Sequence, residues 1–153
     1  MSKVDLFFIS YFFGLAILYI VFDIRDRLQA SNLKKRDWQT SLAKDVLYFC
    51  LSYYPINKKN PSLKLVSEKS NLSGQYCFST NSIILYRLNN MYKAELINTV
   101  IHEYFHFYLI TSNSKYNLYQ RQLKKYSYVD HPQEIICDTM SKKLTNLYLS
   151  KRS

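Results

Sequence analysis

Two of the three histidines of this chain lie four positions apart, in the run His102-Glu103-Tyr104-Phe105-His106. Positions i and i+4 share one face of a helix, so both imidazoles can reach the same metal ion. The carboxylate of Glu103 lies beside them, where it can accept a proton from a water molecule. With so few histidines in the chain, chance is a poor explanation for this spacing. The HExxH motif therefore predicts part of a hydrolytic zinc site.

A third protein ligand is needed, because a hydrolytic zinc ion usually has three and keeps its fourth position for water. We expect Glu134 in this role, since it lies 28 residues beyond His106, at the start of the next predicted helix. His131 and Asp138 are the alternatives. Asp138 could instead accept a hydrogen bond from the ring nitrogen of His102 or His106 that faces away from the metal. Glu134 also has a structural alternative, because an acid in the first turn stabilises a helix N-terminus.

Hydrophobic periodicity and turn residues indicate an α+β domain around this motif. Pro55 ends the first predicted helix, and Pro132 lies in the first turn of the last one. The apolar stripe before the HExxH motif has the period of a helix packed on a core. We expect a helix at residues 38–54 and then three strands, at 63–66, 74–78 and 82–86. The HExxH helix follows at 91–110, a polar loop at 111–129 and a last helix from 131 onward.

The two motif regions resemble zincin-type metallopeptidases of the gluzincin group and are most similar to small ImmA/IrrE-like domains. One region runs from Gly74 through Ile84-Leu85-Tyr86 and Thr99 to His106. The other is Glu134-Ile135-Ile136-Cys137-Asp138-Thr139-Met140-Ser141. It matches the family pattern Glu-x-x-Ala-Asp/Asn-x-Phe/Met-Ala/Ser, except that Cys137 replaces the small alanine. The resemblance covers roughly residues 60 to 145.

The resemblance implies a minimal zincin domain with one zinc ion per chain, held by His102, His106 and Glu134. Glu103 would act as general base toward water and then donate the proton to the leaving amine. The strand at residues 83–86 would be an edge strand that binds an extended substrate through backbone hydrogen bonds. The expected activity is zinc-dependent hydrolysis of peptide bonds in a protein or peptide substrate.

The tetrahedral oxyanion of such a reaction needs a hydrogen-bond donor. Tyr126, Tyr128 and His131 precede the last predicted helix or begin it, and each could supply this donor. The chain has 15 tyrosines, so most of them must have packing or surface roles. All three residues are therefore kept as alternatives for the donor.

An uncharged apolar run of 17 residues, at positions 6–22, predicts one transmembrane helix. Six basic residues follow it closely, against Lys3 alone before it, and this bias predicts a single-pass membrane protein with a cytoplasmic catalytic domain. A cleaved signal peptide and a buried core helix are the alternatives. The predicted organisation is a membrane anchor at residues 1–23, a basic juxtamembrane linker at 24–36 and a zincin-like domain at 37–153.

The net charge of +10 and the pI near 9.5 favour anionic partners. The three cysteines show no paired spacing, which indicates a reducing compartment. One rival function is a membrane-anchored basic binding module, in which Lys115-Tyr116 and Lys124-Lys125-Tyr126 could contact single-stranded nucleic acid. A second rival is a zincin-like protein that has lost peptidase activity or hydrolyses another bond. We favour the metallopeptidase because Glu103 supplies the general base that this reaction needs. With this function, nucleic acid is not an expected partner. No sequence signal fixes an oligomeric state.

Overall fold

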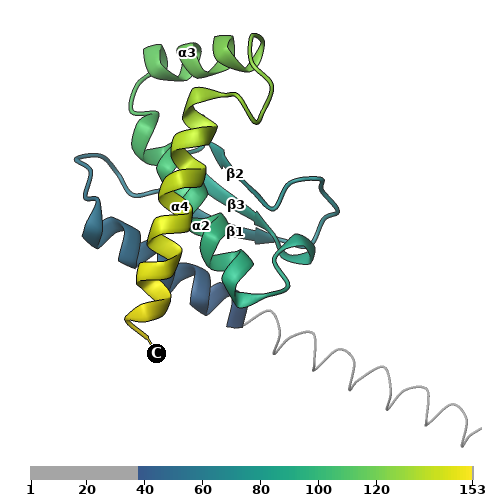
Figure 1. The fold of residues 1–153 in the computed structure, drawn as a ribbon, viewed down its shortest axis with the longest axis vertical. Helices are drawn as coiled ribbons and strands as arrows, with labels where there is room; N and C mark the ends of the chain where they lie inside the picture. The colour runs from purple at the N-terminus through teal and green to yellow at the C-terminus, as the bar shows by residue number, and fades with distance from the viewer. Residues whose placement is uncertain (1–37, 153) are drawn as a thin grey trace, which may run out of the picture. The chain divides into compact units, whose positions relative to one another are not determined.

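The computed structural model describes residues 38–152 of the chain. Within this part, the residues from Gln39 onward form one compact unit of the α+β class. Its elements in chain order are a helix at residues 38–53, β1 (Ser62–Val66), β2 (Gly74–Cys77), β3 (Ser82–Tyr86), the 3-10 helix η1 (Arg87–Asn89), α2 (Lys93–Leu109), α3 (Asn113–Leu123) and α4 (Pro132–Ser150). The helix α2 contacts both α4 and the sheet, so it lies between them (Figure 1).

The three strands form one mixed sheet in the order β1-β3-β2. β1 pairs with β3 in parallel, and β2 pairs with β3 in antiparallel orientation. The side chains of Ile83 and Leu85 in β3 are fully buried. A strand paired on both sides and covered by a helix suits such an apolar run. The prediction that residues 83–86 form an edge strand is therefore wrong, and the edge strand that contacts α2 is β2.

The HExxH motif lies in α2, where ten of the 17 residues are buried. At the start of the helix, the carboxylate of Glu95 accepts a hydrogen bond from the backbone N–H of Tyr92 at 3.4 Å. At its end, the ammonium group of Lys58 donates to the carbonyls of Phe107 and Ile110, at 2.6 and 3.0 Å. A cation at this position satisfies the free carbonyls of a helix C-terminus. Packing on two sides and fixed ends hold the histidine pair on a rigid element.

The first described helix packs its apolar face into the core through Ala43, Val46 and Cys50, which are fully buried. Near its start, the side-chain amide of Gln39 donates hydrogen bonds to the carbonyls of Arg87 and Asn90, at 3.2 and 2.8 Å. These bonds connect the helix to the segment that leads into α2. The predicted helix is confirmed over residues 38–53.

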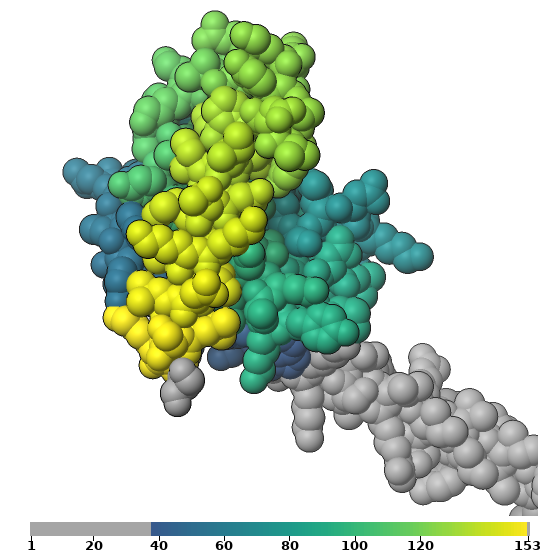
Figure 2. Space-filling model, in the orientation of Figure 1, coloured from purple at the N-terminus to yellow at the C-terminus, as the bar shows by residue number. Residues whose placement is uncertain are grey.

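A helix occupies part of the segment predicted as a polar loop. The Oγ atom of Ser112 accepts a hydrogen bond from the backbone N–H of Lys115 at 3.3 Å and caps α3. None of the α3 residues is buried, so its sequence lacks the strong apolar stripe by which α2 was predicted. Figure 2 shows α3 and the loop after it, in green, at one end of the domain beside the first turns of α4. The loop prediction is wrong over residues 113–123.

The predicted fold class included a transmembrane helix, and this part of the prediction is corrected. Among residues 38–152, no helix is long and apolar enough to cross a membrane. With 19 residues α4 has the length, but Glu134, Asp138, Lys142 and Lys143 lie along it, and charged side chains are costly in hydrocarbon. The apolar run at residues 6–22 and the predicted linker lie outside the described residues.

Candidate functional site

Three side-chain atoms from α2 and the first turn of α4 converge at one point. The Nε2 atoms of His102 and His106 are 3.1 Å apart, and the Oε2 atom of Glu134 lies 3.2 Å from the first and 3.3 Å from the second. All three side chains are buried. In a tetrahedral zinc site with bonds of about 2.0–2.1 Å, neighbouring ligand atoms are about 3.3 Å apart. The three atoms therefore have the spacing of three corners of such a tetrahedron.

Asp138 lies one turn after Glu134 on α4 and faces the other nitrogen of His102. Its Oδ1 atom is 3.0 Å from Nδ1 of that ring. Nδ1–H donates to this carboxylate, so the neutral form of His102 carries its lone pair on Nε2, which faces Glu134. A carboxylate in this position fixes the ring and makes it a more basic ligand. Asp138 therefore supports His102 from behind, outside the group of three converging atoms.

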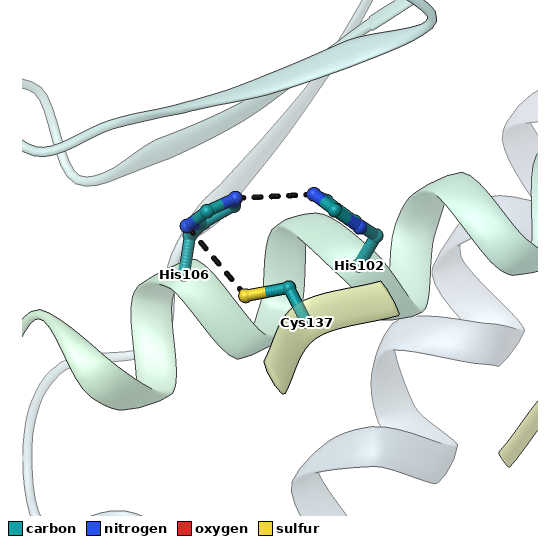
Figure 3. A group of neighbouring side chains, drawn as sticks. All are labelled: His102, His106 and Cys137. Atoms are coloured by element: carbon teal, nitrogen blue, oxygen red, sulfur yellow. Dashed lines mark hydrogen bonds between the residues drawn. The ribbon is translucent and has the colours of Figure 1, made fainter. Parts of the chain in front are cut away.

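Cys137 lies behind the second histidine. Its Sγ atom is 3.6 Å from Nδ1 of His106, and by distance alone His102, His106 and Cys137 form a group that could hold a metal ion. Figure 3 shows that the two contacts of His106 leave from different ring nitrogens, Nε2 toward His102 and Nδ1 toward Cys137. The lone pairs of these nitrogens point in different directions, so one ion cannot bind both. Glu134 therefore completes the histidine pair better than Cys137 does.

Glu103 follows His102 on α2 and lies against β2. Burial raises the pKa of its carboxyl group, and the charges of His106 and His102 oppose this effect. The close approach of the strand depends on Gly74, because a Cβ atom there would lie 2.7 Å from Cγ2 of Thr99 and 3.0 Å from Cγ of Glu103. A buried carboxyl group next to the converging atoms is suited to accept a proton and return it.

The charges of the site favour a cation. Burial opposes the charged form of Glu134, but hydrogen bonds from His102 and His106 hold its pKa well below the usual range. Burial also disfavours protonated His102, yet the hydrogen bond to Glu134 and the charges of Glu103 and Asp138 raise its pKa. Three carboxyl groups thus surround two imidazoles. This excess of acidic groups attracts a positive ion or a proton.

Two tyrosines lie beside Glu134, and one of them bonds to it. Tyr119 of α3 donates a hydrogen bond to Oε1 at 2.8 Å, which leaves Oε2 to the histidines. Tyr128, in the loop before α4, lines the cleft beside Glu134, and this residue is 58% exposed. Burial and the Glu134 carboxylate raise the pKa of both phenols. Tyr126 instead faces Lys125, whose Nζ atom is 5.2 Å from its ring centre. Of the two predicted tyrosines, the structure brings Tyr128 to the site.

His131 is fully buried but does not join the converging atoms. It is the N-cap of α4, and its Nδ1 atom accepts hydrogen bonds from the backbone N–H groups of Gln133 and Glu134, at 3.2 and 3.4 Å. Its ring packs edge-on against Tyr119, with 4.8 Å between the ring centres. His131 therefore fixes the helix turn that carries Glu134.

The converging atoms border a cleft with two hollows, which share Leu72, Gly74, His102, Glu103 and Tyr128. One hollow, of about 590 Å³, is called the polar hollow and is lined mainly by Asn71, Ser73, Asn89, Glu95, Asn98 and Thr99. The other, of about 450 Å³, is called the aromatic hollow. Its apolar and aromatic lining residues include Tyr76, Phe78, Ile110, Tyr116, Tyr119 and Leu123, and His106 and Glu134 line it as well. An extended chain that crosses the site would place side chains in both.

Three contributors to the site were not among the predicted site residues: Tyr119, Cys137 and Gly74. Tyr119 could have been found from Ser112, a preferred N-cap residue, followed by aromatic side chains three residues apart on one helix face. Cys137 follows Glu134 by three positions and so shares its face of α4. The close approach at Gly74 has no local signal, because it depends on how α2 packs against β2.

The comparisons with known proteins add no relative. No family model, no curated protein and no solved structure matches the chain. The functional argument therefore rests on the site geometry and on the chemistry of its side chains.

Proposed function

We propose that this chain is a zinc-dependent metallopeptidase. One observation carries the proposal: three buried atoms of the ligand types that zinc uses lie 3.1 to 3.3 Å apart, on His102, His106 and Glu134. The buried carboxyl group of Glu103 lies beside them. This combination is the one that hydrolysis of a peptide bond needs.

The residues present fit a single zinc ion. Zinc binds imidazole nitrogen and carboxylate oxygen at similar distances and takes a tetrahedral arrangement, for which His102, His106 and Glu134 supply three ligands. Asp138 and Tyr119 orient His102 and Glu134 from outside. When bound, zinc lowers the pKa of water to about 7 and polarises a carbonyl group.

In this reaction, Glu103 is the group that transfers the proton. Its carboxylate accepts the proton of a water molecule whose oxygen bonds to the carbonyl carbon of the substrate. The C–N bond then breaks, and the proton held by Glu103 passes to the leaving amine. We assign the hydrogen bond to the oxyanion to the hydroxyl of Tyr128, because this residue lines the cleft together with Glu103.

A binding module with a structural zinc ion is the competing function. A structural site is closed by four protein ligands. Among the described residues, Cys137 is one further candidate, but its sulfur faces Nδ1 of His106 and not the converging Nε2 atoms. A zincin-like protein without peptidase activity would have no need for the buried carboxyl group of Glu103.

Zinc content and peptide hydrolysis, measured on the full chain, test the proposal together. The parent and the Glu103→Gln and Cys137→Ser variants are expected to retain one zinc ion per chain, whereas His102→Ala and Glu134→Ala lose it. Hydrolysis of an unfolded protein substrate should fall by at least about 10³-fold in Glu103→Gln, because the general base is removed.

Four outcomes would count against the proposal. If the parent binds no zinc, or if Glu134→Ala binds it as well as the parent, the ligand set is wrong. If Glu103→Gln hydrolyses peptides as fast as the parent, Glu103 is not the base. A loss of zinc in Cys137→Ser would favour the closed structural site instead.

A further inference from the structure

The aromatic hollow is built to accept a large apolar side chain. Phe78 and Tyr116 are stacked on one wall, with 4.8 Å between the ring centres and 12° between the ring planes. Among the residues that line the hollow, Ile110 is buried and Leu123 is 40% exposed. The acidic side chains among its described lining residues are Glu103 and Glu134, which belong to the site and not to the stacked aromatic pair. Burial of an apolar side chain against these apolar groups is favourable, because it removes apolar surface of both partners from water.

The helix α3 adds positive charge beside this hollow. Its residues Tyr116, Tyr119 and Leu123 line the aromatic hollow, so they define the helix face that is turned to the cleft. With 3.6 residues per turn, Lys115 and Lys124 lie about a quarter turn to either side of this face. Both side chains are exposed. Two cations therefore flank the aromatic wall of the cleft.

Acidic side chains do not neutralise this charge. Residues 113–125 contain four basic residues and no acidic one. The ion pairs found among residues 38–152 involve none of these four. The acids that line the two hollows are Glu95, which accepts a hydrogen bond from the backbone of Tyr92, and Glu103 and Glu134, which belong to the site itself. An anionic group beside Lys115 or Lys124 on α3 would meet positive charge that no ion pair among the described residues occupies.

We propose that the substrate is an acidic polypeptide segment, bound in extended form across the site with an aromatic or large aliphatic side chain in the aromatic hollow and carboxylates beside Lys115 and Lys124. This inference rests on the proposed peptidase function and adds its substrate class. The open cleft on both sides of Glu103 accommodates a chain that continues in both directions, so the cleaved bond is an internal one.

Nucleic acid fits this surface less well. Stacking of bases needs exposed aromatic faces. The ring of Tyr116 is already stacked on Phe78, and the hydroxyl of Tyr119 is bonded to Glu134. Lys125 likewise faces the ring of Tyr126. These aromatic groups are arranged as a wall of the cleft and not as a platform.

Three fluorogenic peptides of equal length test the substrate class with the zinc-loaded full chain. The first has phenylalanine between aspartate and glutamate residues, the second has alanine for phenylalanine, and the third has lysine for the acids. We expect kcat/KM for the first peptide to exceed that for each of the others about tenfold, and to fall with added salt.

Matched variants assign the preference to the named residues. The double variant Lys115→Glu/Lys124→Glu is expected to lower kcat/KM for the acidic peptide about tenfold, chiefly through KM. The control Lys59→Glu/Lys64→Glu makes the same charge change at exposed sites outside both hollows, and it should leave kcat/KM within about twofold. Tyr116→Ala should abolish the preference for phenylalanine over alanine, and Tyr116→Phe should keep it, because the ring is retained.

Binding to the inactive Glu103→Gln protein separates this inference from the proposed function. If the parent cleaves no peptide, the peptidase proposal fails, while binding of the labelled peptides still reports the preference. Equal binding or cleavage of the acidic and lysine-containing peptides would overturn the inference, as would equal use of phenylalanine and alanine. A single-stranded oligonucleotide that binds more tightly than the acidic peptide would also overturn it, in favour of a nucleic-acid surface.

Discussion

At the scale of single residues, the orientation of His102 depends on one carboxylate. Asp138 accepts a hydrogen bond from Nδ1 of the ring at 3.0 Å, while Nε2 faces Glu134. The side chain of Asp138 is 50% exposed, so its removal leaves the core intact. Its contribution therefore belongs to the geometry and basicity of the ligand and less to folding.

We accordingly expect Asp138→Ala to weaken zinc binding about 10- to 100-fold, measured by competition with a chromophoric zinc chelator. Asp138→Asn is the matched variant, since its amide oxygen can still accept the hydrogen bond from His102. Its loss of zinc affinity should be smaller than that of Asp138→Ala. Equal affinities of the parent and both variants would show that the ring needs no such support.

Gly74 tests how closely β2 must approach the general base. A methyl group at this position would lie 2.7 Å from Cγ2 of Thr99 and 3.0 Å from Cγ of Glu103. We expect Gly74→Ala to cost about 1–3 kcal/mol of stability, as overpacked sites do, and to reduce kcat because Glu103 is displaced. The measurements are the free energy of unfolding in urea and the rate of peptide hydrolysis.

The control for Gly74→Ala is a second substitution that removes the closer of the two contacts. Thr99→Ser lacks Cγ2, so the double variant Gly74→Ala/Thr99→Ser should recover part of the stability. Recovery of stability without recovery of kcat would assign the rate effect to Glu103 itself. An unchanged rate in Gly74→Ala would show that the base tolerates movement of the strand.

At the scale of elements, α3 is held to the domain by few contacts. None of its residues is buried. Its Tyr116 contacts Phe78, and its Tyr119 contacts Glu134, His106 and His131. Elements with few buried contacts open locally at low free energy. The aromatic wall of the cleft is thus carried by an α-helix without a single buried residue.

A change at the N-cap of α3 should therefore loosen this helix alone. Ser112→Ala removes the side-chain acceptor of the Lys115 N–H and is expected to cost about 1 kcal/mol. Amide hydrogen exchange should accelerate about fivefold in residues 113–123, while α2 and α4 keep their protection. Ser114→Ala, inside the same helix, is the control and should not accelerate exchange, because alanine favours helix. Uniform acceleration in all helices would contradict this local opening.

The elements differ in how well the sequence predicted them, and burial accounts for the difference. The strong period of Leu96, Ile97, Val100 and Ile101 located α2, because this face is buried. The exposed α3 has no such period, and it was predicted as a loop. The position of β3 in the centre of the sheet could not be predicted either, since strand order is set by pairing between distant segments and not by local pattern.

In the site, too, residues set by a local pattern were predicted, and contacts between distant segments were not. His102, Glu103 and His106 follow from spacing on one helix, and Glu134 with Asp138 follows from a motif on another. The contact of Tyr119 with Glu134 joins two elements through a loop whose course the sequence does not specify. The exclusion of His131 from the converging atoms likewise depends on its use as an N-cap, which only the three-dimensional arrangement shows.

At the scale of the whole molecule, the converging atoms connect two helices that pack against each other, α2 and α4. The residues that would bind zinc are 32 positions apart in the chain, at His102 and Glu134. A ligand that binds only the folded state stabilises it by RT ln(1 + [L]/Kd). Zinc should therefore act on global stability and not only on the cleft.

We expect zinc to stabilise the folded state by about 1.4 kcal/mol for each tenfold excess of free zinc over Kd. The midpoint of thermal unfolding should then rise by about 5 °C for each such step. Magnesium prefers oxygen ligands and octahedral geometry, so it serves as the control and should give no shift at the same concentrations. Glu134→Ala should lose the response to zinc, because one of the three converging atoms is absent. A shift of equal size in Glu134→Ala would place the bound zinc elsewhere on the protein, and α2 and α4 would then be held together by packing alone.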